Sequence, residues 1–329
     1  MDAVKGGEDV KKKNQWTVKH TGILLMAAVL VISLGAVLAA PVGNMVTKRN
    51  TQGAQGGTTK PLMPQQLAET EKKEAKREWR KQLEQQAARV EVPEALRDGA
   101  SLVNLDGSLE EQRIKGFQRI CVDKELTEAE KTILTDFVLA YPQQTETLYV
   151  LYDFLYDYFF TKQDLQLAMQ RCQNGENVES VLEDYFNIEQ SYQPPQVESE
   201  RVYYYIEERG LSADDSAIAK TLTFRQVSEY ETIMGRLSSG ETWEQIGIEL
   251  ELLNLSGRMR TLTVTQEEVQ QTQKTLHISE EEAVSKVAEA KKANVPEEAL
   301  TEYLTGKQSS GAALKQRSID VYQSDEGRD

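Results

Sequence analysis

The chain has 329 residues, a formal net charge of −15 at pH 7, two cysteines and two histidines. So few Cys and His residues exclude a zinc framework built from four such ligands and disfavour a His-based catalytic site. The first 22 residues carry a net charge of +2 and the remainder carries −17, which repels nucleic-acid phosphates. The sequence contains no P-loop, Gly-x-Ser-x-Gly or Gly-x-Gly-x-x-Gly motif. We therefore expect no metal, no cofactor and no nucleic-acid partner.

Residues 1–22 form a short polar head, and residues 23–41 are predicted to be a transmembrane signal anchor. The segment Ile23 to Ala40 is uncharged, and a helix of this length extends about 27 Å, close to the roughly 30 Å of bilayer hydrocarbon. Four lysines closely precede the segment and three basic residues follow it, which favours a cytoplasmic N-terminus and an extracytoplasmic body. The alternative is a signal peptide cleaved near Ala39, which would secrete the body.

The next two segments are predicted to hold the body away from the bilayer. Residues 42–66 are rich in Gly, Thr, Gln and Pro and lack a hydrophobic period, which is typical of a flexible linker. Residues 67–91 alternate in charge and are rich in helix-forming residues, which favours a charged, solvated helical stalk. The alternative is a short coiled-coil contact through the one apolar stripe of this segment, which consists of Trp79, Leu83, Ala87 and Val90.

Residues 92–306 are predicted to form an all-α domain, either a bundle or a solenoid-like stack of helical hairpins. Five Ser or Thr residues have an acid or amide three positions later, the spacing of a capping box that starts a helix; they are Thr127, Thr161, Thr223, Thr265 and Ser279. Four glycines are expected to end helices, namely Gly175, Gly210, Gly240 and Gly306. The best strand candidate, Arg260 to Val264, is weak, and residues 307–329 are predicted to be a polar, frayed tail.

Three stretches of the domain resemble one another. Residues 161–185, 223–250 and 279–304 each combine a capped helix, a turn and a second helix. A single pair of helices cannot bury its apolar face alone, so neighbouring pairs are expected to stack. The sequence leaves open whether the three stretches are true repeats.

The segment Thr147 to Phe160 is the most apolar part of the domain. It is apolar on nearly every side, which predicts a central, largely buried helix. The alternative is that Tyr149, Tyr152 and Tyr156 form a partly exposed stripe that binds a protein partner, because tyrosine combines a large apolar ring with a polar end.

The two cysteines of the domain, Cys121 and Cys172, are 51 residues apart. An oxidising exterior would permit a disulfide between them. Both cysteines lie on apolar helix faces, so the alternative is two buried thiols. The sequence does not decide between these two states.

The leading functional prediction is a single-pass, membrane-anchored helical interaction or scaffold protein of the cell envelope, without a catalytic site. An alternative is a cell-wall enzyme, because Val178-Glu179-Ser180 resembles the Glu-Ser element of lytic transglycosylases and would make Glu179 the general acid; the Gly-Leu-Met-Gln element that should follow is absent. A third hypothesis is a transmembrane regulator, because Ser238 to Leu250 resembles a helix-turn-helix. The stretch Gly240 to Leu253 has four Glu and no Lys or Arg, which argues against DNA binding.

Overall fold

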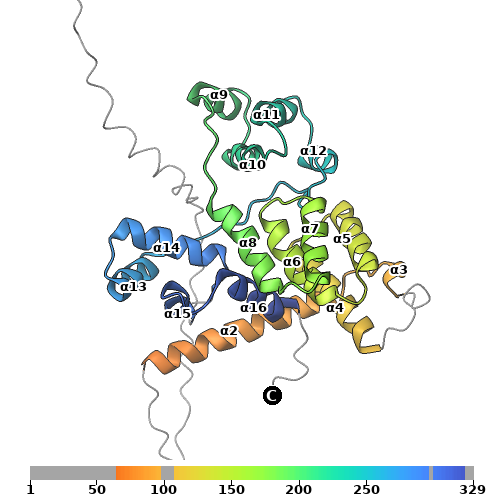
Figure 1. Ribbon diagram of the computed structural model, residues 1–329, viewed down its shortest axis with the longest axis vertical. Helices are drawn as coiled ribbons and strands as arrows, with labels where there is room; N and C mark the ends of the chain where they lie inside the picture. The colour runs from red at the N-terminus through yellow and green to blue at the C-terminus, as the bar shows by residue number, and fades with distance from the viewer. Residues whose placement is uncertain (1–63, 98–106, 296–298, 323–329) are drawn as a thin grey trace, which may run out of the picture. The chain divides into compact units, whose positions relative to one another are not determined.

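The computed structural model describes residues 64–97, 107–295 and 299–322, and within these ranges the chain is helical and has no β-strand (Figure 1). Every described residue belongs to one compact unit within Pro61–Asp329. The predicted polar head, the predicted transmembrane segment and nearly all of the predicted linker therefore lie outside the described residues. Within the described ranges, no helix is long and apolar enough to span a bilayer.

The prediction of an all-α domain is confirmed for the described residues. Most helices are short, and turns of a few residues join many of them. The elements in chain order are α2 (Pro64–Ala87), α3 (Glu94–Arg97), α4 (Gly107–Asp123), α5 (Glu128–Ala140), α6 (Thr145–Asp157), α7 (Lys162–Gln173), α8 (Val178–Gln190), α9 (Ser199–Tyr203), the π-helical turn η2 (Tyr204–Glu208), α10 (Ala213–Phe224), α11 (Tyr230–Ser238), α12 (Trp243–Glu249), α13 (Gln266–Leu276), α14 (Glu280–Lys292), α15 (Leu300–Leu304) and α16 (Ser310–Tyr322).

Four of the five predicted capping boxes start helices. In each, the cap hydroxyl accepts a hydrogen bond from the third backbone N–H of the helix, and the acid at that position accepts one from the cap N–H; these caps are Thr127, Thr161, Thr265 and Ser279. The prediction at Thr223 is wrong, because this residue lies at the end of α10 and its hydroxyl donates to the Ala219 carbonyl at 2.9 Å. A threonine inside a helix commonly bonds back to the preceding turn in this way.

The glycines predicted to end helices do so. All four have positive φ, between 74° and 97°, a conformation that glycine adopts without the steric cost of a Cβ atom. The strand candidate Arg260 to Val264 has no regular secondary structure and pairs with no strand among the described residues.

Helix α6 is the centre of the main bundle. Leu148, Leu151, Tyr152 and Leu155 are all 0% exposed, and α4, α7, α8 and α16 pack around the helix (Figure 1). The prediction of a central, buried helix in this segment is confirmed.

The C-terminal segment is a core helix, which corrects the prediction of a polar tail over residues 307–329. Helix α16 packs on α8, α6 and α4, and Leu314 and Ser318 are 2% and 1% exposed. The Gly311 N–H donates to the Glu183 carboxylate at 2.6 Å, and a methyl group at Gly311 would overlap the backbone of Glu179. The polar composition of this segment suggested a solvated tail. Several of its polar side chains instead pair with groups on the bundle.

Helix α2, within the predicted stalk, packs on the same bundle through its C-terminal half. Leu83 and Ala87 are 6% and 4% exposed and belong to the face that meets α4. The Arg119 guanidinium of α4 pairs with the Glu84 carboxylate at 2.8 Å. Trp79, by contrast, is 43% exposed. The C-terminal part of the apolar stripe therefore packs within the domain, and Trp79 at its N-terminal part stays exposed.

The three similar stretches contain the helix pairs α7–α8, α11–α12 and α14–α15. Each pair turns through a residue of positive φ, at Gly175, Gly240 and Asn294. The pairs pack on different neighbours, since α8 packs on α16, α11 on α10 and α14 on α13. The described domain is therefore a bundle with appended helices, not a regular stack of hairpins.

Candidate binding groove

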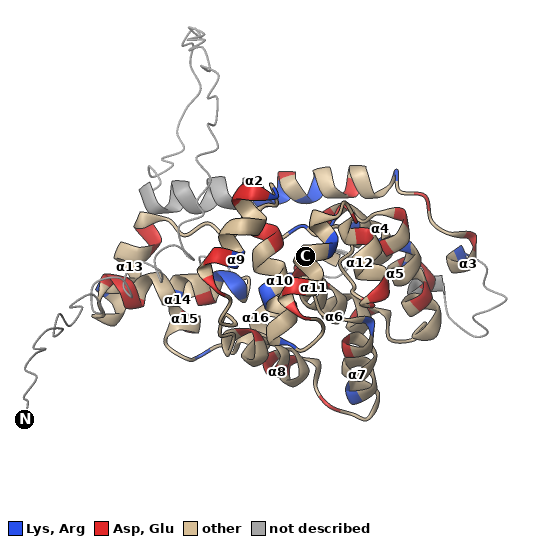
Figure 2. Ribbon diagram, turned by 90° about the horizontal axis from the view of Figure 1, so that it is seen from above, with Lys and Arg blue, Asp and Glu red and all other residues tan. Residues whose placement is uncertain are grey.

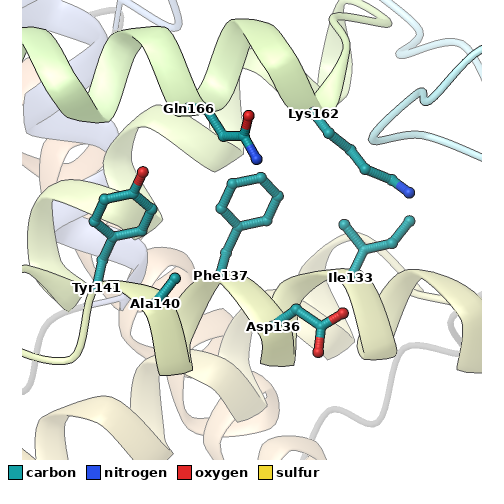
Figure 3. A pocket seen from close by; sticks show the side chains of 7 residues that line it. All are labelled: Ile133, Asp136, Phe137, Ala140, Tyr141, Lys162 and Gln166. Atoms are coloured by element: carbon teal, nitrogen blue, oxygen red, sulfur yellow. The ribbon is translucent and has the colours of Figure 1, made fainter.

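A groove lies on the surface between α5 and α7 (Figure 3). Its volume is about 300 Å³, at the lower end of the roughly 300–1,000 Å³ typical of ligand pockets. In Figure 3, Gln166 and Lys162 point from α7 towards Phe137 and Ile133 on α5. The residues that line this groove are Ile133, Asp136, Phe137, Ala140, Tyr141, Lys162 and Gln166.

Local hydrogen bonds position the two helices of the groove. Helix α5 begins at the capping box of Thr127, and α7 begins at that of Thr161. The Lys162 N–H donates to the Glu251 carbonyl at 2.7 Å, and Thr161 forms an isolated antiparallel bridge with Leu252. The first turn of α7, which carries Lys162, is therefore fixed against the segment that follows α12.

One face of α5 forms the apolar floor of the groove. Ile133 and Phe137 lie four residues apart on α5, and Tyr141 follows at the C-terminal end of the helix, so the stripe covers about 12 Å. Ile133 and Phe137 are 9% and 6% exposed, and the rings of Phe137 and Tyr141 stack with centroids 6.4 Å apart. The stripe is absent from the sequence-based predictions, although its four-residue spacing after the Thr127 capping box is typical of an apolar helix face.

Two charges border the floor. Neither the Lys162 ammonium nor the Asp136 carboxylate has a hydrogen bond or ion pair with another residue that the structure describes. Lys162 stands on the α7 side and Asp136 on the α5 side, so opposite charges flank the apolar floor (Figure 3). Elsewhere, acidic residues occur on helices throughout the described part (Figure 2), and many of them are paired.

A buried carboxylate holds the segment after α12 against α5. Glu130 is 0% exposed and accepts hydrogen bonds from the backbone N–H groups of Leu255 at 2.7 Å, Ser256 at 3.1 Å and Thr127 at 2.7 Å. The Tyr156 hydroxyl donates to it at 3.0 Å. These four donors satisfy the carboxylate without a cation, and they keep the segment that contacts the start of α7 in place.

A second polar cluster is buried between α4, α6 and α16. Asp153, 2% exposed, pairs with Arg317 and with Lys124 at 2.6 Å, and accepts hydrogen bonds from Ser318 at 2.8 Å and Tyr322 at 3.0 Å. Burial alone would raise the pKa of the Asp153 carboxyl, but Arg317 and Lys124 outweigh burial and hold the pKa well below its ordinary value. The charged and hydroxyl groups of the cluster bond to one another, so we assign the cluster a structural role, which is to hold α16 against α4 and α6.

The three tyrosines considered for partner binding lie in the core. Tyr149, Tyr152 and Tyr156 are 3%, 0% and 4% exposed. The Tyr149 hydroxyl, for example, donates to the Arg113 carbonyl at 2.6 Å. Their rings are used for packing inside the domain, and the tyrosine that lines the groove is Tyr141.

Both cysteines are free thiols in the structure, so Cys121 and Cys172 are not joined by a disulfide. Cys121 is 4% exposed, and burial raises the pKa of its thiol to about 12. Cys172 is half-buried, and burial raises the pKa of its thiol as well. The raised pKa values keep both thiols mostly protonated near neutral pH, which lowers their reactivity.

Glu179 occupies a different setting from that of a glycosidase acid. Its side chain is 37% exposed and pairs with the Lys315 ammonium at 2.9 Å. A general acid of this kind needs an apolar pocket that keeps its carboxyl protonated, which a half-exposed, ion-paired carboxylate lacks. Within the described residues, no group of three or more acidic, His or Cys side chains is placed to hold a metal ion.

The stretch that resembles a helix-turn-helix forms α11 and α12. The Trp243 indole N–H donates to the Asp215 carboxylate at 2.7 Å, and the ring lies against Gly257, where a methyl group would overlap it. Trp243 therefore packs α12 against α10 and against the segment around Gly257.

No protein-family model, curated protein or solved structure matches this chain.

Proposed function

We propose that this chain is a single-pass, membrane-anchored interaction protein of the cell envelope that binds a protein partner in the groove between α5 and α7. The apolar floor of this groove is the observation that carries the proposal. Ile133, Phe137 and Tyr141 give a continuous apolar stripe on a surface helix, and such a stripe at helical spacing is suited to an amphipathic segment of a partner.

The anchor rests on the amino-acid sequence. The uncharged segment Ile23 to Ala40 matches the length of a bilayer span, and the flanking basic residues favour an extracytoplasmic domain. The predicted role of the intervening linker is to let the domain reach partners near the membrane. The mechanism is display of a binding surface, and no covalent chemistry is required.

Site-specific photo-crosslinking in cells that produce the full chain tests the proposal. A photoreactive amino acid replaces Ala140, an exposed residue of the groove; the matched control replaces Ala213, an exposed alanine at the start of α10. We expect one defined adduct with an envelope protein from position 140 and none from position 213. The proposal fails if position 140 gives no adduct, or if both positions give the same adducts.

A further inference from the structure

The walls of the groove differ in charge, and this difference defines the partner more closely. Lys162 on α7 and Asp136 on α5 stand on opposite sides of the apolar floor, and both lack an ion-pair partner among the described residues (Figure 3). The inference that follows rests on the proposed function of the groove and specifies the chemistry of its occupant.

The floor has the geometry of one side of a helical seam. Ile133, Phe137 and Ala140 follow the spacing i, i+4 and i+7 on α5, and Tyr141 is the residue that directly follows this helix. Lys162 and Gln166 follow i and i+4 on α7. Two helices that present such a seam can accept a third helix, whose apolar side chains fill the groove while charged side chains on its flanks meet the walls. The length of the floor corresponds to about two turns of that helix.

We propose that the groove takes an amphipathic helix of a partner protein whose apolar stripe is bordered by an acid on one flank and a base on the other. The acid pairs with the Lys162 ammonium, and the base pairs with the Asp136 carboxylate. The two flanks of a helix exchange sides when its direction is reversed, so the two pairs also set the direction in which the helix lies. Opposite charges on the flanks of a coiled-coil seam select partners and orientation by the same means.

Net charge alone makes a different prediction. The chain after Gly22 carries −17, so a purely electrostatic surface would bind a helix more tightly for every added cation. Replacing a base by an acid on one flank of the helix tightens binding only if that acid forms an ion pair with the Lys162 ammonium. The two explanations therefore rank differently charged peptides in different orders.

The test uses fluorescence anisotropy with the purified full chain at physiological salt. Three labelled helical peptides of about 18 residues share one leucine stripe and differ in their flanks: Glu on one flank and Lys on the other, Lys on both, or Glu on both. We expect the mixed peptide to bind about two- to fivefold more tightly than either of the others, the range of one exposed ion pair. Lys162→Glu should make the peptide with two Lys flanks the tightest, and Asp136→Lys should make the peptide with two Glu flanks the tightest.

Control variants separate the groove from the rest of the surface. Ala140→Arg fills the groove and should abolish binding of the mixed peptide, whereas Ala213→Arg should leave it unchanged. Affinity that rises steadily with lysine content in the wild-type chain, or a ranking that Lys162→Glu does not change, overturns the inference. If a defined crosslink forms at position 140 while the peptides show no preference for the mixed flanks, the assigned partner chemistry is wrong and the interaction role of the groove stands. If neither crosslink nor peptide binding occurs, both fail.

Discussion

Replacing Asp153 by Asn should lower the free energy of unfolding of this domain far more than a substitution at an exposed ion pair does. Asp153 is 2% exposed and meets two cations, Arg317 and Lys124, as well as two hydroxyl donors. Removing one partner of a buried ion pair costs about 3–5 kcal/mol, because the remaining charge stays buried without compensation. Lys124 still pairs with Asp157 at 2.7 Å and Arg317 with Asp123 at 3.3 Å, so we expect a loss of about 3 kcal/mol, the lower end of this range.

The assay is urea denaturation of the purified full chain, followed by far-UV circular dichroism, with the free energy of unfolding obtained by linear extrapolation. The matched control is Glu125→Gln, which removes an ion pair with Arg258 whose side chains are 75% and 58% exposed. An exposed pair contributes at most about 1 kcal/mol. Equal losses for the two variants, or a loss below about 1 kcal/mol for Asp153→Asn, would refute the assignment of the cluster to fastening α16.

The same variant has a defined pH dependence. The pKa of Asp153 is lowered in the folded protein, below the roughly 3.9 of an unfolded Asp. The folded state therefore gains stability from the Asp153 carboxylate above about pH 4, and loses it as the pH falls towards the folded pKa. The difference in unfolding free energy between wild type and Asp153→Asn should be largest at neutral pH and should shrink below about pH 4.

Four further predictions concern other parts of the chain. Gly311→Ala should destabilise the domain by about 1–3 kcal/mol in the same urea assay, because the added methyl group meets the backbone of α8; no measurable loss would contradict the close packing of α16. Thr161→Ala should cost about 1 kcal/mol through loss of a helix cap, whereas Thr223→Ala should cost less because Thr223 caps no helix; the reverse order would contradict these assignments. Thiol titration of the unreduced protein in denaturant should find two free thiols, and in the folded protein Cys172 should react before the buried Cys121; a titre of none in denaturant would indicate a disulfide. A reporter fused at the C-terminus should be active only as an extracytoplasmic fusion, and cytoplasmic activity would overturn the predicted topology.

Much of the local structure could be predicted from the sequence, and the failures have a common cause. The caps at Thr127 and Thr161 are predictable because a capping box is formed by residues three positions apart. Thr223 has the same spacing, but the position is already inside α10, where its hydroxyl bonds to the preceding turn. Where α10 ends decides the role of Thr223, and the spacing of residues three positions apart does not show where a helix ends.

The candidate site differs from the predicted one, because the sequence pattern favoured the tyrosines of the most aromatic helix, α6. Tyr152 and its neighbours in α6 are buried by α4, α7, α8 and α16, and a helix this apolar is suited to the core. The groove instead combines a stripe on α5 with Lys162 and Gln166 on α7. A periodicity search can find one wall of such a groove, but the opposite wall comes from another helix and depends on how the two helices pack.

The sequence by itself determined the helical class, several helix starts, the glycine turns and the central place of α6, because each depends on hydrogen bonds or side-chain periodicity within a few turns of chain. Only the tertiary structure decided that α16 is a core element, that Asp153 meets Arg317 and Lys124, and that a groove lies between α5 and α7. These features join residues from different helices. Whether a charge is buried and paired, or exposed and open to a partner, is set by neighbours distant in the chain.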